Sequence, residues 1–583
     1  MSGEMRSFTR VDDIFGRTLQ KQMRNGEDEI LLNNEYTYRD ISGSRTTRQV
    51  SEQLITTVDE FGDIQTLAEY QMTYDDRGNI SAIVQDGETA FRYEYDDANQ
   101  LVREDNLANG NSTVYTYDAG GNMTNRTRYP FTLEDEFGEA TSSEDFVYYG
   151  DILLGTADEE LEIAYDEIGN ALNWQGGSCY TAGGNSFLDM QVNGAFEWEG
   201  RNLARASGTG TLFGTPVTGE LEYRYDADGL RTDKIIEMTP GTATEPVNIH
   251  YQYIWDNGRF MGYYINIPAM EGALSPQEGG GLLEMGGSFV MRIIYSDNGE
   301  ALGYAYVLFD SDGSAIMTDC VWYIKNVLGD VQGLYSENLK LLGAYYTYDA
   351  WGMPTMHKSE ELCGFEGQIQ FLIFQITNQL TYRGYFYDFE TGLYYLQSRY
   401  YSPTMCRFIN ADKHFDTGTG VLGTNMYIYC DNNPIAWTDH SGELGANKIE
   451  SVTLKENCAL ENGTEGSITA TVDYIGKTPT YKWKSSDSSV LKVTWSGDTA
   501  KLEPKKPGKA IVTCEADQGW LNLKKKDSCT VYVFGKGCYK IIWNGAARSN
   551  MHLYVGSTKK LKAEAIPNEK MFNDLSVGLY VLK

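Results

Sequence analysis

The chain has 583 residues, including 61 Gly, 42 Tyr and 13 Pro, and a formal net charge of −34 at pH 7. Hydrophobic residues make up 41% and aromatic residues 13%, which supplies a core and argues against general disorder. The excess of acid argues against nucleic acid and anionic membrane surfaces as partners, because both are bound by clustered Lys and Arg.

The N-terminal residues MSGEMRSFTRVDD contain no apolar segment of the kind that a signal peptide requires. No run approaches the roughly 18 apolar residues of a membrane-spanning helix, and the longest candidate, at 368–376, is too short. We therefore expect no membrane span, and no signal peptide in this chain. A cytosolic protein, export by another route and a fragment of a longer protein all stay open.

A short pattern recurs over residues 59–352: two aromatic residues two positions apart, then Asp, a few small residues, Gly, Asn or Arg, and an apolar residue. The clearest copies contain Tyr74, Tyr95, Tyr117, Tyr165, Tyr225 and Tyr348. Alternation such as FRYEY at 91–95 predicts a strand with its aromatic residues on one face. The Asp-x-x-Gly-Asn segment predicts a tight turn. Successive β-hairpins must then pair into a long sheet that curls or closes to protect its edges.

These residues resemble the YD repeats of Rhs proteins, and the match strengthens toward residue 440. The segments YIKNVLGDV, YTYDAWG, YRGYFYD, TGLYYL, RYY, RFINAD and YIYCDNNP follow in the order of the Rhs-associated core. The resemblance implies an all-β fold, with a spiral YD-repeat sheet forming a hollow shell over 1–320 and an Rhs core closing one end over 321–442. In many relatives the shell holds a variable C-terminal toxin, which self-cleavage releases from the core.

The family ends its core with Pro, four residues and Asp-Pro-x-Gly-Leu, and cleavage follows the Leu. Pro434, Asp439 and Gly442 match this pattern, whereas His440 stands for Pro and Glu443 stands for Leu. The resemblance implies an aspartyl-type reaction, in which a protonated and an ionised carboxyl group activate water against a peptide carbonyl.

The candidates for this chemistry are Asp412, Asp431 and Asp439, with Arg407 as a charge partner. A structural interpretation competes, in which these Asp residues cap turns as Asp does throughout the chain. It is the favoured one, because both departures from the family pattern fall at the scissile end. Apart from this self-cleavage, we expect no enzyme activity.

The tail after residue 442 has a different character. Residues 443–583 hold 21 Lys plus Arg and 15 Asp plus Glu, a net charge of +6, so the first 442 residues carry −40. Short alternating strands with turn signals about 8–12 residues apart predict a β-sandwich. The segments WKSSDSSV and KKPGKA resemble bacterial Ig-like (group 2) domains, which implies such a domain over 443–534. VGSTKKLKA is similar to the start of a second copy, incomplete over 535–583.

The nine Cys include Cys514 and Cys529, on strands that flank a hairpin, where a disulfide is a candidate. Cys458 and Cys538 are further candidates, and free thiols are the alternative. The sequence contains no CxxC, HExxH, phosphate-binding loop, dinucleotide fingerprint or GxSxG, and its Asp-rich turns lack the later Glu of a calcium loop. We therefore expect no cofactor and no metal.

Two functional hypotheses result. The first is a bacterial secreted or cell-surface shell protein, acting as a structural, adhesion or display scaffold with an Ig-like module and binding cell-surface protein or carbohydrate ligands. The second is a polymorphic toxin, or its remnant, whose shell encapsulates its own C-terminal segment and releases it by self-cleavage. The tail shows no convergent catalytic constellation, which favours the first hypothesis.

Overall fold

The computed structural model describes most of the chain, and every structural statement below concerns the described residues. These are 6–13, 17–41, 45–59, 61–158, 161–173, 180–181, 188–191, 195–212, 215–240, 246–256, 258–268, 286–296, 299–413, 422–442, 448–454, 457–475, 480–517 and 525–534. The chain divides into two compact units, Met1–Glu443 and Leu444–Lys583, which are described separately. The predicted second Ig-like copy at 535–583 lies outside the described residues.

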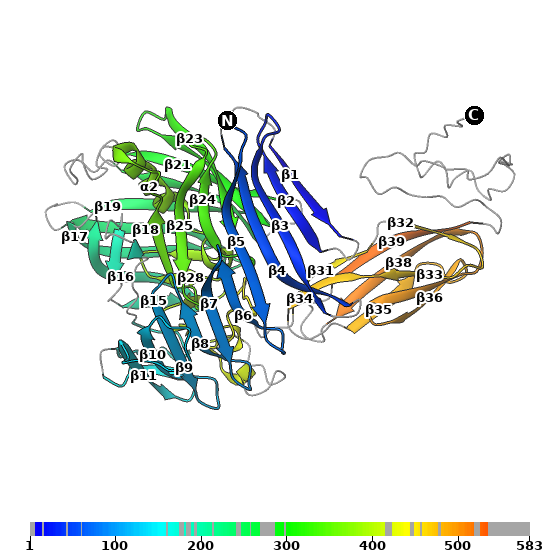
Figure 1. Cartoon of the computed structure of the whole chain (residues 1–583), viewed down its shortest axis with the longest axis horizontal. Helices are drawn as coiled ribbons and strands as arrows, with labels where there is room; N and C mark the ends of the chain where they lie inside the picture. Colours follow the sequence, from blue (N-terminus) through cyan, green and yellow to red (C-terminus); the bar gives the residue numbers. More distant parts are fainter. Residues whose placement is uncertain are drawn as a thin grey trace. The chain divides into compact units, whose positions relative to one another are not determined.

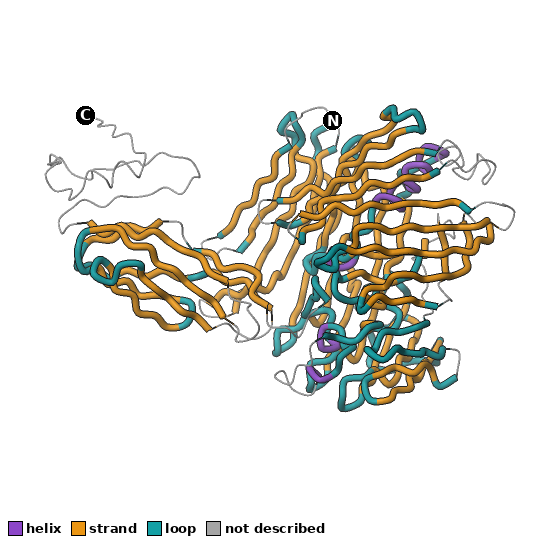
Figure 2. Tube along the Cα trace, turned by 180° about the vertical axis from the view of Figure 1, so that it is seen from behind, coloured by secondary structure: helices purple, strands orange, loops and turns teal. Residues whose placement is uncertain are grey.

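The first unit contains two large sheets (Figures 1 and 2). In the first sheet the strands pair in sequence order from β1 to β12, every pair antiparallel. They are β1 (Ser7–Asp12), β2 (Thr18–Arg24), β3 (Ile30–Ile41), β4 (Arg45–Val58), β5 (Ile64–Tyr74), β6 (Ile80–Gln85), β7 (Glu88–Tyr95), β8 (Leu101–Asn106), β9 (Asn111–Tyr117), β10 (Met123–Pro130), β11 (Ser142–Tyr149) and β12 (Ile152–Thr156).

The second sheet has the order β13-β26-β25-β24-β23-β22-β21-β20-β19-β18-β17-β16-β14, with β15 also paired to β16. Its strands are β13 (Tyr180–Thr181), β14 (Leu188–Gln191), β15 (Phe196–Glu199), β16 (Asn202–Leu212), β17 (Thr215–Tyr225), β18 (Arg231–Pro240), β19 (Val247–Asp256), β20 (Arg259–Ile267), β21 (Gly287–Tyr295), β22 (Ala301–Phe309), β23 (Ala315–Lys325), β24 (Val331–Ser336), β25 (Leu341–Tyr348) and β26 (Pro354–Lys358). The prediction of an all-β fold with long antiparallel sheets is confirmed. The predicted boundary at 320 falls inside β23, because the sheet continues to Lys358.

The turn of each Tyr-Asp unit is built on the Asp side chain. Asp75 Oδ1 accepts the backbone N–H of Arg77 at 2.9 Å and of Asn79 at 2.8 Å, and Oδ2 accepts the Asn79 side chain at 2.9 Å. Gly78 has a φ of +94°, a left-handed conformation that favours glycine. The bond from the backbone N–H four positions later to Oδ1 of the Asp side chain recurs in seven more turns, at Asp59, Asp96, Asp118, Asp166, Asp226, Asp310 and Asp349.

The Tyr of each pair ties its hairpin to the preceding one. Tyr95 Oη donates to the Ile80 carbonyl at 2.8 Å, and Tyr117 Oη donates to the Leu101 carbonyl at 2.7 Å. In both cases the acceptor is the first residue after the previous turn. Tyr348 makes the equivalent bond to Val331, whereas Tyr74 and Tyr225 donate to the carbonyls of Val50 and Leu203, which lie within β4 and β16.

A smaller region follows the second sheet. It comprises α2 (Gly364–Thr377), η2 (Tyr382–Gly384), β27 (Phe386–Asp388), β28 (Leu393–Tyr395), β29 (Tyr400–Ser402), β30 (Arg407–Phe408), η3 (Leu422–Thr424) and η4 (Cys430–Asn432). The apolar run at 368–376 forms most of α2, whose Ile373, Phe374 and Ile376 are fully buried. Among the described residues no helix combines the length and hydropathy needed to cross a membrane.

The two large sheets meet through buried polar side chains near Glu104. Its Oε1 accepts the Ala350 N–H at 2.8 Å and Asn106 Nδ2 at 3.1 Å, and its Oε2 accepts the Tyr115 hydroxyl at 3.1 Å. Burial, and to a lesser degree the nearby Asp349 carboxylate, raises the pKa of Glu104 to about 8. Burial also raises the pKa of Asp349. This contact therefore favours a protonated Glu104 at neutral pH.

The second unit is a β-sandwich. A four-stranded sheet with the order β32-β39-β38-β35 and a three-stranded sheet with the order β33-β37-β36 contribute to one hydrophobic core, in which Trp483, Val512 and Leu502 are buried. The strands are β31 (Lys448–Thr453), paired with β34 (Thr471–Ile475), together with β32 (Asn457–Glu461), β33 (Gly466–Thr469), β35 (Thr480–Ser485), β36 (Leu491–Ser496), β37 (Thr499–Pro504), β38 (Gly508–Asp517) and β39 (Lys525–Phe534). The alternation predicted around Trp483 is present, with Lys482 and Lys484 exposed on either side.

The candidate disulfide between Cys514 and Cys529 is not formed, since Cys514 is a free thiol. The register of β38 and β39 explains this: Cys514 lies opposite Asp527, and Cys529 lies opposite Val512. The two cysteines are therefore diagonal neighbours, which are farther apart than directly opposed residues. Both belong to the buried core of the sandwich, where cysteine packs as a small apolar residue.

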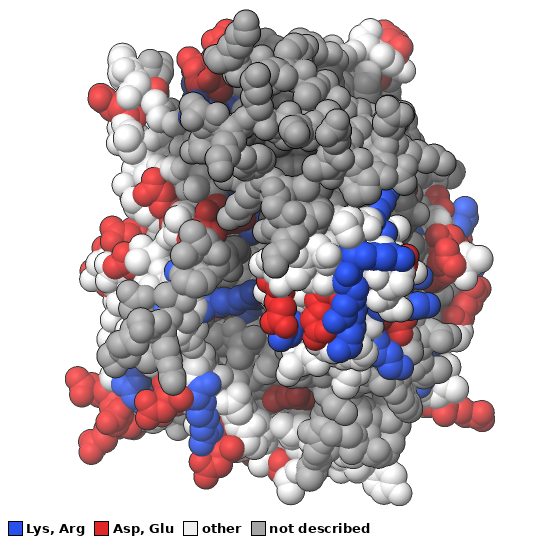
Figure 3. Space-filling model, turned by 90° about the vertical axis from the view of Figure 1, so that its right-hand side faces the viewer, with Lys and Arg blue, Asp and Glu red and all other residues white. Residues whose placement is uncertain are grey.

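Acidic side chains of the described residues are dispersed over the face that Figure 3 shows. On the face that Figure 3 shows, Asp and Glu lie in several separate groups with Lys and Arg between them. The net charge of −34 therefore does not gather into one continuous acidic surface on this face.

The hydrogen bond from the Tyr hydroxyl to the carbonyl contributes measurably to the free energy of unfolding. Tyr95→Phe removes the hydroxyl that binds Ile80, and we expect a loss of about 1 kcal/mol in the free energy of unfolding. The matched control is Tyr149→Phe, at a side chain that is 76% exposed, where we expect no change. Urea unfolding followed by tryptophan fluorescence measures both; equal midpoints for the two variants would contradict the role of the bond.

The raised pKa of Glu104 predicts a pH-dependent stability. Since its pKa is near 8 in the folded chain and near 4.5 ordinarily, the folded state binds the additional proton, and stability falls as pH rises between these values. Glu104→Gln mimics the protonated group and does not titrate. We expect the variant to gain at least about 1 kcal/mol relative to the unmodified chain between about pH 5 and pH 9. A difference that stays constant with pH in urea unfolding would refute this assignment.

Candidate functional site

A segment that carries three of the four predicted site residues, Arg407, Asp412 and Asp431, runs along the turns of the Tyr-Asp units. We call residues 407–433 the strap; its described parts are 407–413 and 422–433. Asn433 Nδ2 donates to the Asn99 carbonyl at 2.9 Å and to Asn79 Oδ1 at 3.2 Å. Asn432 Nδ2 donates to the Gly121 carbonyl at 2.7 Å and to Gln100 Oε1 at 2.9 Å. Two neighbouring asparagines thus bind three successive turns.

The strap continues to further turns. Asn425 Nδ2 donates to Asn122 Oδ1 at 2.9 Å, and Tyr427 Oη donates to the Gly169 carbonyl at 2.9 Å. Gly169 has a φ of +85°, and a Cβ there would lie 2.5 Å from Tyr427 Oη. The glycine of the turn is therefore needed both for its conformation and for the close approach of the strap.

Arg399 is the centre of the candidate site, although the sequence did not single it out. This buried residue precedes β29, and its Nη2 lies 3.1 Å from Asp412 Oδ2 and 3.5 Å from Asp439 Oδ2. Its Nη1 donates to the Met426 carbonyl at 3.2 Å, and its guanidinium carbon lies 3.6 Å from the centre of the Phe408 ring. Two of the three predicted carboxylates thus converge on one guanidinium.

The same arginine holds the last described residues of the first unit. Arg399 Nε donates to the Gly442 carbonyl, and Ser398 Oγ donates to the Ser441 carbonyl at 2.6 Å. Gly442 has a φ of +70°, and a Cβ there would lie 2.8 Å from Ser398 Oγ and 2.9 Å from the Leu396 carbonyl oxygen. Only glycine fits this position. We call Ser398, Arg399 and their contacts with 439–442 the clamp.

Asp431 and Arg407, the other two predicted residues, have different surroundings. Asp431 is exposed on η4 in a left-handed conformation, with a φ of +50°. Arg407 is buried; its Nη2 donates to the Asp151 carbonyl, and its guanidinium lies 5.1 Å from the Tyr148 ring and 5.0 Å from the Tyr427 ring. Arg407 therefore joins β30 to the β11–β12 turn, and the position of charge partner belongs to Arg399. Glu443, the predicted scissile residue, lies outside the described residues.

A second cluster of buried charges anchors the strand before the clamp. Arg231 on β18 binds both oxygens of Asp388 at 2.7 Å. Lys234 lies 3.4 Å from Asp388 Oδ1 and 3.0 Å from Glu390 Oε1. All four side chains are almost completely buried, and two cations balance two anions. This cluster fixes β27 to the second large sheet; it is enclosed, with no opening for a substrate among the described residues.

The described residues include no group of three or more His, Cys, Asp or Glu side chains placed to hold a metal ion. The clamp holds the chain segment 439–442. The carboxylates that are placed to act on a peptide bond of this segment are those of Asp412 and Asp439. Sequence reasoning found Asp412 and Asp439 through the family motif. The segment RYY that begins with Arg399 was also visible, but nothing local indicated that this arginine would bind both carboxylates.

Comparisons with known proteins agree with the repeat pattern. Residues 95–131 match the family model described as RHS Repeat. The tRNA3(Ser)-specific nuclease WapA of Bacillus spizizenii is 26% identical over 357 residues, which is 60% of this chain and 12% of that protein. The tRNA(Glu)-specific nuclease WapA of Bacillus subtilis subsp. natto is 36% identical over 121 residues, 21% of this chain and 5% of that protein. The chain therefore spans only a small part of these curated relatives.

Two solved structures are similar over most of the chain. The Photorhabdus luminescens Tc holotoxin pore aligns with 75% of this chain and 19% of its own, at 17% identity and a TM-score of 0.49. The TcdB2–TccC3 structure aligns with 75% of this chain and 21% of its own, at 16% identity and a TM-score of 0.49.

The clamp predicts that the end of the first unit is protected from proteolysis. Arg399→Gln leaves Asp412 and Asp439 without their shared cation and removes the donor to Gly442, so the 439–442 segment should detach. We expect a Glu-specific endoprotease to cut after Glu443 several-fold faster in this variant. The control is Arg224→Gln, at a side chain that is 55% exposed with an ion pair to Glu222. Equal cleavage rates in the two variants, measured by mass spectrometry, would show that the clamp does not hold the segment.

Proposed function

We propose that residues 1–443 form a bacterial Rhs-type scaffold, secreted or at the cell surface, that holds its own C-terminal end and presents the following β-sandwich as an Ig-like adhesion or display module. The observation that carries this proposal is the clamp: Arg399 and Ser398 bind the carbonyls of Gly442 and Ser441 at the end of the first unit. A segment fixed in this way gives a defined starting point for whatever follows it.

The geometry of the clamp favours holding over cutting. In an aspartyl-type site the two carboxyl groups share a proton and act on a water between them. Here Asp412 and Asp439 both face the Arg399 guanidinium. Both carboxylates are thereby engaged as partners of one guanidinium, whereas acid–base catalysis needs a carboxyl group that exchanges a proton with a water.

The interpretation of the region up to 442 as an Rhs core is supported by the strap. Its Asn432 and Asn433, within the motif YIYCDNNP, bind the turns of three Tyr-Asp units. A core motif that recognises the repeat turns gives a physical reason why the two occur in the same chain. The RHS Repeat match at 95–131 covers two of those turns.

The architecture of the second unit supports the proposed display role. It is a β-sandwich with one hydrophobic core, an architecture that many cell-surface domains share.

A toxin carrier is the second candidate, and two observations favour it. The relatives are named as tRNA nucleases, and two predicted carboxylates do converge beside Gly442. In this alternative the first unit would enclose the C-terminal segment and cut the chain near residue 443. Expression of residues 443–583 in the bacterial cytoplasm separates the two candidates, because growth arrest would favour the toxin and normal growth the display module.

The proposal predicts a chain that does not cut itself. The purified protein should keep its full mass of 65.4 kDa during prolonged incubation from mildly acidic to neutral pH. The matched variants are Asp412→Asn and Asp439→Asn, with Asp431→Asn as the exposed control. If the unmodified chain separates into two fragments near residue 443, and Asp412→Asn or Asp439→Asn stays intact, self-cleavage replaces the display role as the function of the site.

A further inference from the structure

Three reactive side chains of the first unit, those of Lys234, Asp388 and Glu390, are completely enclosed. Lys234 lies on β18, Asp388 is the last residue of β27, and Glu390 follows two positions later. None of the three side chains is exposed to solvent, and among the described residues Lys234 is the only lysine buried to this extent. An amine and a carboxyl group that no substrate can reach can still react with each other.

Lys234 is placed against both carboxyl groups. Its Nζ lies 3.0 Å from Glu390 Oε1 and 3.4 Å from Asp388 Oδ1. The rings of Tyr251 and Phe389 cover the amine, with their centres 4.5 Å and 5.2 Å from Nζ. Reacting groups held about 3–3.5 Å apart need no encounter in solution, and an aromatic cover keeps out the water that would hydrolyse a product.

The two carboxyl groups are held differently. Both oxygens of Asp388 accept Arg231 at 2.7 Å, and although burial acts in the opposite direction, this cation keeps the pKa of Asp388 below its usual range. Glu390 accepts the Tyr223 hydroxyl at 3.4 Å through Oε1, and its Oε2 has no hydrogen-bond partner among the described residues. Burial raises the pKa of Glu390, and the charge of Asp388 adds to the increase. Asp388 therefore stays an anion, whereas Glu390 is the group that can take up a proton and become an electrophile.

We propose that Lys234 and Glu390 form an intramolecular amide bond, a covalent cross-link between β18 and the segment after β27. A proton first passes from Nζ to the Glu390 carboxylate, and the free amine attacks Cδ. The N–C bond forms while the bond from Cδ to Oε2 breaks. Asp388 carries the second proton from Nζ to the leaving oxygen, which departs as water. One ammonium and one carboxylate thus become one amide and one water, without any other reactant.

The surroundings of Lys234 favour proton transfer within the cluster. Burial lowers the pKa of Lys234, but the two carboxylates raise it overall, so the amine loses its proton to Glu390 and not to solvent. The amide removes one cation and one anion together and leaves Arg231 paired with Asp388. The buried cluster therefore stays neutral, and Oε2, the buried oxygen without a partner, is released.

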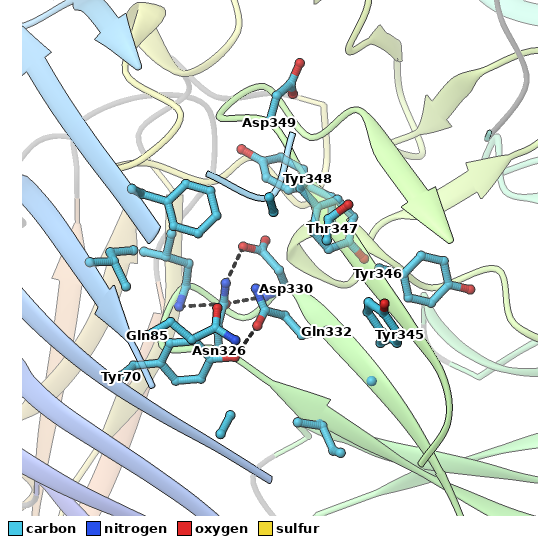
Figure 4. A pocket seen from close by; sticks show the side chains of 18 of the residues that line it. Tyr70, Gln85, Asn326, Asp330, Gln332, Tyr345, Tyr346, Thr347, Tyr348 and Asp349 are labelled. Atoms are coloured by element: carbon cyan, nitrogen blue, oxygen red, sulfur yellow. Dashed lines mark hydrogen bonds between the residues drawn. The ribbon is translucent and has the colours of Figure 1, made fainter. Parts of the chain in front are cut away.

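Other buried carboxylates of the first unit face nitrogens of a different kind. Figure 4 shows one of them: at the wall of a cavity of about 230 Å³, Asp330 accepts Asn326 Nδ2 at 2.8 Å. Asp412 and Asp439 face the Arg399 guanidinium. Amide and guanidinium nitrogens have delocalised electron pairs and are poor nucleophiles, whereas a lysine amine is a good one. The cluster between β18 and β27 differs because its nucleophile is an amine.

The cross-link goes beyond the proposed display role and holds whether the tail is displayed or released. It joins the second large sheet to the smaller region that contains the clamp. A covalent link between residues this far apart in the chain restricts the unfolded state, and so it stabilises the folded one.

Mass spectrometry of the denatured full-length protein tests the proposal. Because the amide bond releases one water, we expect a mass about 18 Da below the value calculated from the sequence. Trypsin does not cut after an acylated lysine, so we expect the peptides 232–259 and 384–399 to appear as one joined species. The double variant Lys234→Met with Glu390→Met removes one cation and one anion, which keeps the charges balanced, and it should have its full calculated mass.

The control is Lys492→Met, which removes an amine 3.3 Å from Glu503 at the surface of the second unit and should keep the mass deficit. Three results would overturn the proposal: the full calculated mass in the unmodified protein, tryptic cleavage after Lys234, or the same deficit in the double variant. The mass of the unmodified protein decides the question even if the double variant does not fold. The loss of one water differs from separation into two fragments near residue 443, so the cross-link and the display role can fail independently.

Discussion

The Tyr-Asp pair is the interaction on which the rest of the first unit depends. Its Asp closes the turn by accepting the N–H groups two and four residues on, and its Tyr donates to the first carbonyl after the previous turn. One dipeptide thus sets both the conformation of a turn and the register of its hairpin against the one before. The bond recurs between β4 and β5, between β6 and β7 and between β8 and β9, within a sheet whose strands pair in sequence order.

Regular turns also create a surface that another part of the chain can recognise. Side chains such as Asn79, Gln100 and Asn122 occupy the same place in successive turns, and the strap places Asn433, Asn432 and Asn425 against them. The strap in turn positions Asp412, while Arg399 links that carboxylate to Asp439 and Gly442. The site at the end of the unit is therefore a consequence of repeat geometry at its start. Buried ion clusters such as Arg231 with Asp388 add the long-range contacts that fix the smaller region to the second sheet.

Much of this was predictable from the sequence, because turns and strand alternation are local properties. The Asp-x-x-Gly-Asn turns, the long antiparallel sheets and the sandwich around Trp483 follow from short segments, each with its own periodicity. Pairings between distant residues are less accessible from sequence: Cys514 and Cys529 were a candidate disulfide with free thiols as the alternative, and only the register of β38 and β39 shows that they are offset. Arg399 was visible but unassigned, since its two carboxylates lie 13 and 40 positions further along the chain. Only the packing of the strap brings them together.

In this structure an uncut chain is held at residues 439–442 by a clamp that the repeat turns position. A cryo-electron microscopy map of the full-length protein is the decisive measurement. We expect continuous main-chain density through Gly442, with Asp412 and Asp439 on the Arg399 guanidinium and with Asn432 and Asn433 on the turns that contain Asn99 and Gly121. A map in which the chain ends at residue 443, or in which the strap lies away from those turns, would contradict it.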